Sequence, residues 1–141
     1  MTLKQIKEWY GNDEPEELVE FATIHPKTSG LKHCIYYSAK VPQHGPRVKI
    51  ANRCEETQLK GKYDIIAFNN KSAVLLEKGN IKIKNKERLA YTYAVKQTRH
   101  LLMKYWNFAL GMTDEEQFQL KKEIDSNIIK YFNKYIKGDN I

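Results

Sequence analysis

The sequence of 141 residues predicts an α+β domain in which a sheet comes first and two helices follow it. Residues 17–84 hold short runs of β-branched and aromatic side chains between turn residues, which is typical of strands. Residues 86–136 instead carry apolar side chains at helical spacing. The length fits a single domain, which we expect to cover residues 1–141. The expected architecture is a short N-terminal helix, an antiparallel sheet of about five or six strands, and two C-terminal helices packed on that sheet.

Six strands are predicted from the apolar runs that turn residues bound on both sides. These runs cover residues 18–24, 34–37, 47–51, 62–68, 73–77 and 81–84. In the last run isoleucines alternate strictly with lysines, so we expect one buried face and one solvated face. Before the first strand, Thr2 can cap a short helix over residues 2–10, which Gly11 would end.

Two long helices are predicted in the C-terminal half of the chain. The first covers Lys86–Leu110, where an apolar stripe would face the sheet and Gly111 would end the helix. This stripe contains Leu89, Ala90, Tyr93, Ala94, Leu101, Leu102, Tyr105 and Phe108. The second helix begins at Thr113, because Thr113 and Glu116 can exchange hydrogen bonds in a capping box. Apolar positions continue this helix to about residue 136, and Gly138 can terminate it.

Positive charge is concentrated in the middle of the chain, although the net charge is only +7. Residues 1–26 carry two basic against six acidic side chains, and residues 105–141 carry five against six. Between them, residues 27–104 carry seventeen basic against five acidic side chains. A surface of this kind selects polyanions or an acidic protein face. The alternative, which stays open, is that the lysines serve only to keep the protein soluble.

The sequence also argues against a membrane protein and against a disulfide-rich fold. No apolar run approaches the roughly 18 residues that span a bilayer, and the N-terminus lacks the apolar stretch of a secretory signal. We therefore expect a cytoplasmic protein, or one inside a particle assembled in the cytoplasm, with no membrane partner. Cys34 and Cys54 are the two cysteines of the chain. We interpret them as half-buried thiols, because two cysteines do not make a disulfide framework.

Two groups of residues resemble metal sites in composition, but neither has the spacing that such a site needs. His33, Cys34, His44 and Cys54 lack the tight pairs that aim two side chains at one zinc ion. Asp64, Glu77 and Lys78 have the residue types of a metal-dependent nuclease, which we keep as a second alternative function. Glu77 and Lys78 are adjacent in a strand, however, so their side chains would project to opposite faces. We expect no metal, no other cofactor and no catalytic residue.

The leading prediction is a small non-enzymatic protein that binds nucleic-acid backbone. Phosphate contacts need only positive groups at roughly backbone spacing, and aromatic side chains among them can stack on bases. The candidate binding residues are His44, Arg47, Lys49, Lys82, Lys84, Lys86, Arg88, Lys96, Arg99 and Lys104. The alternative is a protein-interaction module that binds an acidic protein face, such as a viral or mobile-element inhibitor or a particle component. The sequence leaves open the choice between DNA and RNA, and the oligomeric state.

Overall fold

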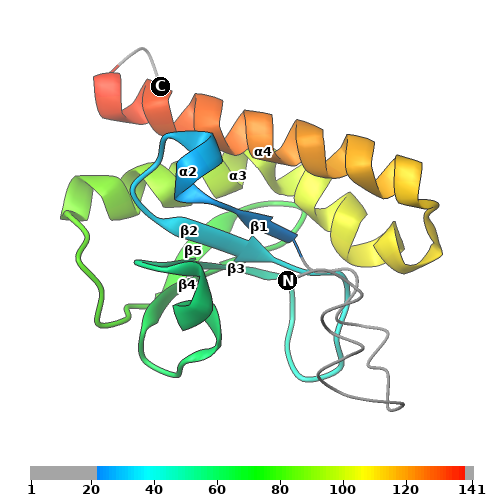
Figure 1. Cartoon of the computed structure of the whole chain (residues 1–141), viewed down its shortest axis with the longest axis horizontal. Coiled ribbons are helices and arrows are strands. Elements are labelled where there is room, and N and C mark those ends of the chain that lie inside the picture. Colours follow the sequence, from blue (N-terminus) through cyan, green and yellow to red (C-terminus); the bar gives the residue numbers. More distant parts are fainter. Residues whose placement is uncertain (1–21, 139–141) are drawn as a thin grey trace.

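The computed structural model describes residues 22–138, which form a five-stranded antiparallel sheet with two long helices packed on one face (Figure 1). The strands are β1 (Ala22–Ile24), β2 (Cys34–Tyr37), β3 (Arg47–Ala51), β4 (Tyr63–Phe68) and β5 (Ala73–Glu77). Their order in the sheet is their order in the chain. The predicted α+β class is therefore confirmed. The helix predicted over residues 2–10 and the first residues of the predicted strand 18–24 lie outside the described part of the chain.

Both long helices begin and end close to the predicted residues. They are α3 (Asn85–Phe108) and α4 (Asp114–Lys137), joined by the 3-10 turn η3 (Ala109–Gly111). The capping box that starts α4 is present, with the Glu116 amide donating to the Thr113 hydroxyl and the Thr113 amide donating to the Glu116 carboxylate. Gly138 ends α4 at φ 71°, a left-handed conformation that glycine adopts at little cost.

The core lies between the two helices and the sheet face that the strand alternation turns toward them. Ile35, Tyr37, Val48, Ile50 and Ile66 project from that face and are almost completely buried. Helix α4 covers it with the apolar stripe Leu120, Ile124, Ile128 and Phe132. No helix within residues 22–138 has an apolar stretch long enough to cross a membrane.

The buried face of α3 differs from the predicted stripe. The exposed fractions of Leu89 and Phe108 are 49% and 61%, so the expectation that both face the sheet is wrong. The side chains that α3 does bury follow the helical period on a neighbouring face: Glu87, Ala90, Tyr91, Ala94, Val95, Thr98, Leu102, Tyr105 and Trp106. Helical spacing fits either stripe, and each stripe carries three aromatic side chains, so the packing of α3 against the sheet and α4 decides which face is buried.

The predicted sixth strand, residues 81–84, is not a strand. Ile81 and Ile83 are half-buried against the core and the two lysines are exposed, as the alternation predicts. The backbone of this segment pairs with side chains instead of a neighbouring strand. Alternation reports which side chains are buried, and an extended segment can satisfy it without joining a sheet.

The interpretation of the two cysteines as thiols is also wrong. Cys34 at the start of β2 and Cys54 at the start of the 3-10 turn η2 (Cys54–Gln58) form a disulfide. Spacing along the chain gives no sign of this pair, because the strand register brings the two segments together. Cys34 is the Cα partner of Ala51, so the chain needs only three further residues to bring the second sulfur over the first.

We expect Thr113→Ala to lower the free energy of unfolding by about 1 kcal/mol, because the first turn of α4 loses the hydroxyl that accepts from the Glu116 amide. Urea unfolding followed by circular dichroism measures this change. Thr113→Ser keeps the hydroxyl and serves as the control. Equal midpoints for the alanine and serine variants would contradict the role of the cap.

Candidate functional site

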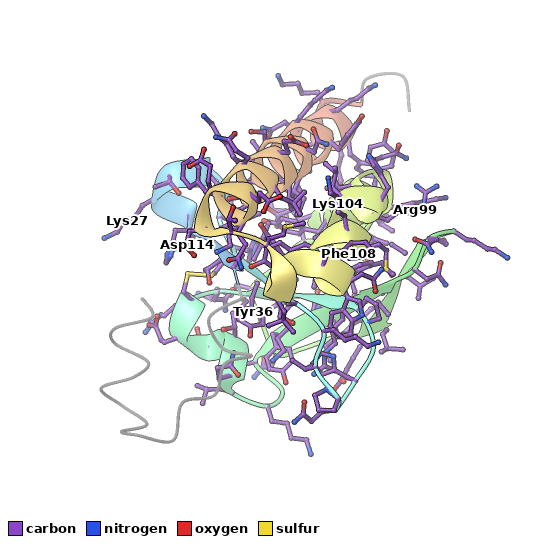
Figure 2. The ribbon with its side chains drawn as sticks, turned by 90° about the vertical axis from the view of Figure 1, so that its right-hand side faces the viewer. Lys27, Tyr36, Arg99, Lys104, Phe108 and Asp114 are labelled. Carbon is purple, nitrogen blue, oxygen red and sulfur yellow. A yellow bond between two sulfur atoms is a disulfide. The ribbon has the colours of Figure 1, made fainter. Side chains whose placement is uncertain are left out.

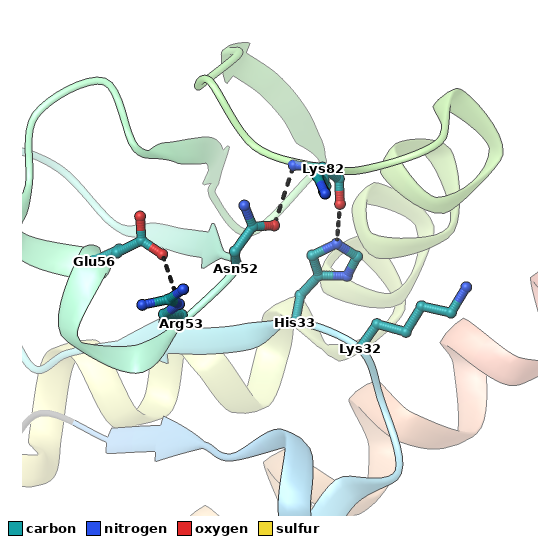
Figure 3. A pocket seen from close by; sticks show the side chains of 6 residues that line it. All are labelled: Lys32, His33, Asn52, Arg53, Glu56 and Lys82. Atoms are coloured by element: carbon teal, nitrogen blue, oxygen red, sulfur yellow. Dashed lines mark hydrogen bonds and ion pairs between the residues drawn. The ribbon is translucent and has the colours of Figure 1, made fainter.

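An open pocket with a cavity volume of about 590 Å³ lies where β2 begins and β3 ends, beside the segment that connects β5 to α3 (Figure 3). It is lined by Lys32, His33, Asn52, Arg53, Glu56 and Lys82. Three of these side chains are cationic and they come from three different segments of the chain. Figure 3 shows them around a centre formed by neutral polar groups.

The neutral groups of the pocket fix the backbone of Lys82. The Lys82 carbonyl accepts a hydrogen bond from His33 Nε2 at 2.7 Å, and the Lys82 amide donates to Asn52 Oδ1 at 3.1 Å. Because a carbonyl can only accept, His33 Nε2 carries a proton, and in the neutral ring Nδ1 accepts from the Tyr91 hydroxyl at 2.9 Å. Both backbone polar groups of Lys82 are therefore hydrogen-bonded, while its side chain is exposed to water.

Within residues 22–138, the carboxylate partners of the pocket's cations are weak. Lys32 Nζ lies 3.7 Å from Glu87 Oε2, and Arg53 Nε lies 4.0 Å from Glu56 Oε1. The Lys32 and Arg53 side chains are 73% and 75% exposed, whereas the Glu87 and Glu56 side chains are 12% and 20% exposed. Long pairs with a solvent-exposed cation contribute little stability. An anion with more charge than a carboxylate can therefore displace Glu87 and Glu56 from these two cations.

Arg88, one of the predicted binding residues, is occupied inside the protein. Its Nε donates to Asp64 Oδ2 at 2.8 Å, and the two side chains are 17% and 2% exposed. Its Nη2 also donates to Asp64 Oδ1 and to the Gly79 carbonyl, each at 3.2 Å. The Arg88 guanidinium is therefore largely buried and paired with a carboxylate that requires a cation, which argues against a contact between Arg88 and phosphate.

Lys49 is buried as well, on the sheet face opposite the long helices. Its Nζ donates to the Thr57 carbonyl at 3.0 Å and lies 5.4 Å and 4.5 Å from the ring centres of Tyr36 and Tyr63. Burial, and then the nearby charge of Arg47, lower the pKa of Lys49 to about 8. The side chain fixes η2 to the sheet and is not presented to a partner.

His44 and Arg47 lie in and after the loop between β2 and β3. His44 Nδ1 donates to the Gly45 carbonyl at 2.7 Å, and the His44 ring centre lies 6.0 Å from that of Trp106. Partial burial lowers the pKa of His44. Arg47 is half-buried, and its Nε has no hydrogen-bond partner in the part of the chain that the structure describes.

The other predicted binding residues are spread along the surface. Lys84 and Lys86 are exposed at the beginning of α3, and Lys96 is exposed further along it. Arg99 is half-buried and donates to the carbonyls of Asn70 and Lys96. Figure 2 shows Arg99 and Lys104 on α3, with exposed Phe108 at the end of that helix. The ten predicted residues therefore do not form one patch.

The groups that resembled metal sites hold no metal-ligand cluster among residues 22–138. Cys34 and Cys54 are bonded to each other and are not thiolate ligands. Asp64 accepts from Arg88 and from the Gly79 amide at 2.8 Å, so its carboxylate oxygens are already paired. The geometry of a metal-dependent nuclease is therefore not assembled around Asp64.

Sequence reasoning missed Lys32 and Arg53, which the structure places beside Lys82. Strand pairing is what indicates that these two residues meet. Lys32 lies two residues before β2, and Arg53 lies two residues after β3. Antiparallel neighbours bring the start of one strand to the end of the next. The bounds of both strands were predicted correctly, but the pairing and register that bring Lys32 and Arg53 together were not.

No protein-family model, no curated protein and no solved structure matches this chain significantly.

We expect Arg88→Met to destabilise the protein by about 3–5 kcal/mol, because it leaves the buried Asp64 carboxylate without its cation. Lys86→Met, at an exposed site two residues away, is the control and should change stability by less than about 0.5 kcal/mol. Denaturant unfolding of both variants measures the difference. Similar midpoints would show that the ion pair contributes no stability.

We expect the titration of Lys49 to increase the free energy of unfolding as the pH rises from 8 to 9.5. Folded Lys49, with a pKa of about 8, loses its proton in this range, whereas the unfolded chain keeps it up to the ordinary value of 10.5. The unfolded state then binds more protons, so stability rises with pH. Urea unfolding of wild type and Lys49→Met at pH 7, 8.5 and 9.5 tests this. The difference between the two proteins should grow in favour of wild type, and parallel pH profiles would contradict the shift.

Proposed function

We propose that this protein binds the phosphate backbone of nucleic acid through the cationic pocket, defined here by Lys32, Arg53 and Lys82. The observation that carries the proposal is the convergence of these three cations on one open pocket. Within residues 22–138, the carboxylates paired with Lys32 and Arg53 are Glu87 at 3.7 Å and Glu56 at 4.0 Å, and such long pairs leave much of the positive charge uncompensated. A polyanion supplies the missing negative charge and gains entropy from the counterions that it releases.

The chemistry of the pocket favours contact with backbone over readout of bases. Its cationic groups end in flexible, exposed side chains, which suit phosphates at variable positions. The polar side chains of His33 and Asn52 are hydrogen-bonded to the backbone of Lys82, so these groups are not free to bind base edges. Lys84 and Lys86 follow Lys82 along the chain and are exposed, so a bound strand can extend toward the start of α3. We therefore propose binding that is largely independent of sequence.

A second candidate function is recognition of an acidic protein face, and one observation favours it. Phe108, Leu110 and Phe118 are more than half exposed around the turn between α3 and α4. Protein interfaces depend on a few apolar anchors of this kind, which backbone binding does not need. Lys104 on the same end of α3 would supply the charge complementarity.

Binding of labelled single-stranded DNA, duplex DNA and RNA at several salt concentrations tests the leading proposal. If the cationic pocket contacts about three phosphates, the affinity for duplex DNA should fall with a log–log slope of about −2 to −3. The triple variant Lys32→Gln, Arg53→Gln, Lys82→Gln should lose most of that slope and bind weakly to all sequences. All three side chains are exposed, so its melting temperature should stay close to that of wild type.

The control is a second triple variant with the same change in charge, Lys122→Gln, Lys130→Gln and Lys137→Gln, at exposed positions of α4. It should keep nearly the full affinity and slope. Equal weakening in both triple variants would mean that net charge, and not the pocket, attracts the polyanion. If wild type binds none of the three nucleic acids at low salt, the backbone proposal is wrong and the protein-partner candidate takes its place.

A further inference from the structure

The disulfide is built into the walls of the cationic pocket. Lys32 and His33 immediately precede Cys34, and Asn52 and Arg53 immediately precede Cys54. Four of the six lining residues therefore belong to the two short segments that the disulfide joins. The position of these segments relative to each other sets the shape of the pocket.

Apart from the disulfide, these segments are held by the β2–β3 ladder and by hydrogen bonds of His33 and Asn52 to the Lys82 backbone and of Lys49 to the Thr57 carbonyl. The disulfide adds the covalent connection to these weaker contacts. Pairing between β2 and β3 ends at Cys34 and Ala51, so Lys32 and Arg53 lie beyond its last paired residues. Their like charges repel each other and Lys82 when no anion is bound. The disulfide is the covalent connection nearest to this repulsion, and it opposes the separation of the two cations.

The two sulfur atoms differ in accessibility and surroundings. Cys34 is completely buried, whereas Cys54 is half-buried and its Sγ lies 3.3 Å from His25 Nδ1. An external thiolate can therefore reach the Cys54 sulfur more readily than the Cys34 sulfur. An N–H at His25 Nδ1 can donate a hydrogen bond to a thiolate that forms at Cys54.

We infer that the Cys34–Cys54 disulfide is a redox control of the cationic pocket, which binds polyanions tightly when the disulfide is formed and weakly when a dithiol reductant has opened it. This inference rests on the proposed function. The oxidised form holds Lys32 and Arg53 against their repulsion, so an anion finds both in place. The reduced form lets them separate, and binding must then bring them back.

The exchange reaction is balanced by the dithiol. One of its thiolates attacks the Cys54 sulfur, the sulfur–sulfur bond breaks, and Cys34 leaves as a thiolate that takes up a proton. The second thiol of the reductant then loses its proton and attacks the reductant sulfur that is bonded to Cys54, and Cys54 leaves as a thiolate that takes up the second proton. Two electrons and two protons pass from the dithiol to the two cysteines, and the reductant leaves as a cyclic disulfide.

The test compares the full chain in oxidised form, after treatment with dithiothreitol, and as the double variant Cys34→Ala, Cys54→Ala. Mass spectrometry after thiol alkylation verifies each state, and labelled single-stranded DNA at fixed salt is the probe. Reduction should weaken binding by about tenfold, in the range typical of coupled sites. The double variant should bind like the reduced protein and should not respond to dithiothreitol. Hydrogen exchange should become faster in residues 52–58 of the reduced form.

Each other outcome overturns the inference or separates it from the proposed function. Equal affinities of the oxidised and reduced proteins show that the disulfide does not control the pocket, while the proposed function stands. Loss of helical circular dichroism on reduction also overturns it, because a control of binding needs two folded states. If neither form binds DNA at low salt, the proposed function itself fails. The triple variant Lys32→Gln, Arg53→Gln, Lys82→Gln should show no redox dependence in its residual binding.

Discussion

The buried ion pair between Asp64 and Arg88 is the interaction on which the rest of the structure depends. It joins β4 to the first turn of α3, and both groups also bond the backbone of Gly79. A side chain at position 79 would collide with the Tyr63 backbone, so glycine lets the chain pass against β4. The segment after Gly79 then leads to Lys82, whose backbone is fixed by two further side chains. The same ion pair thus positions helix, sheet and one wall of the pocket.

Much of the fold could be predicted from the sequence, because the information is local. The strands at residues 34–37, 47–51 and 73–77 have the predicted bounds, and the capping box of Thr113 fixes the start of α4. The face of α3 was not predictable in the same way, since two stripes share the helical period. Only the three-dimensional packing of the sheet chooses between them.

Less of the site could be predicted, because it is made by contacts between distant segments. Lys82 is exposed, as the alternation of residues 81–84 predicts. The local sequence does not distinguish Lys82 from Arg88, which pairs with the buried Asp64 carboxylate 24 residues away. Lys32 and Arg53 stand outside the lysine-rich run and come together only through strand pairing. The charges along the sequence predict a positively charged surface. The place where these charges come together can be predicted only with the register of the strands.

The order of the elements along the chain has a consequence for synthesis on the ribosome. All five strands precede both long helices, so the apolar sheet face that carries Ile35, Val48 and Ile66 is made before the residues that cover it. At about 5–20 residues per second, the stretch from Asn85 to Lys137 takes on the order of 3–10 s to appear. During that interval the apolar strand residues lack the helices that cover them in the folded protein, and exposed apolar segments of this kind are prone to aggregation. Packing of α3 and α4 on the sheet then buries this apolar face and removes it as a site of aggregation.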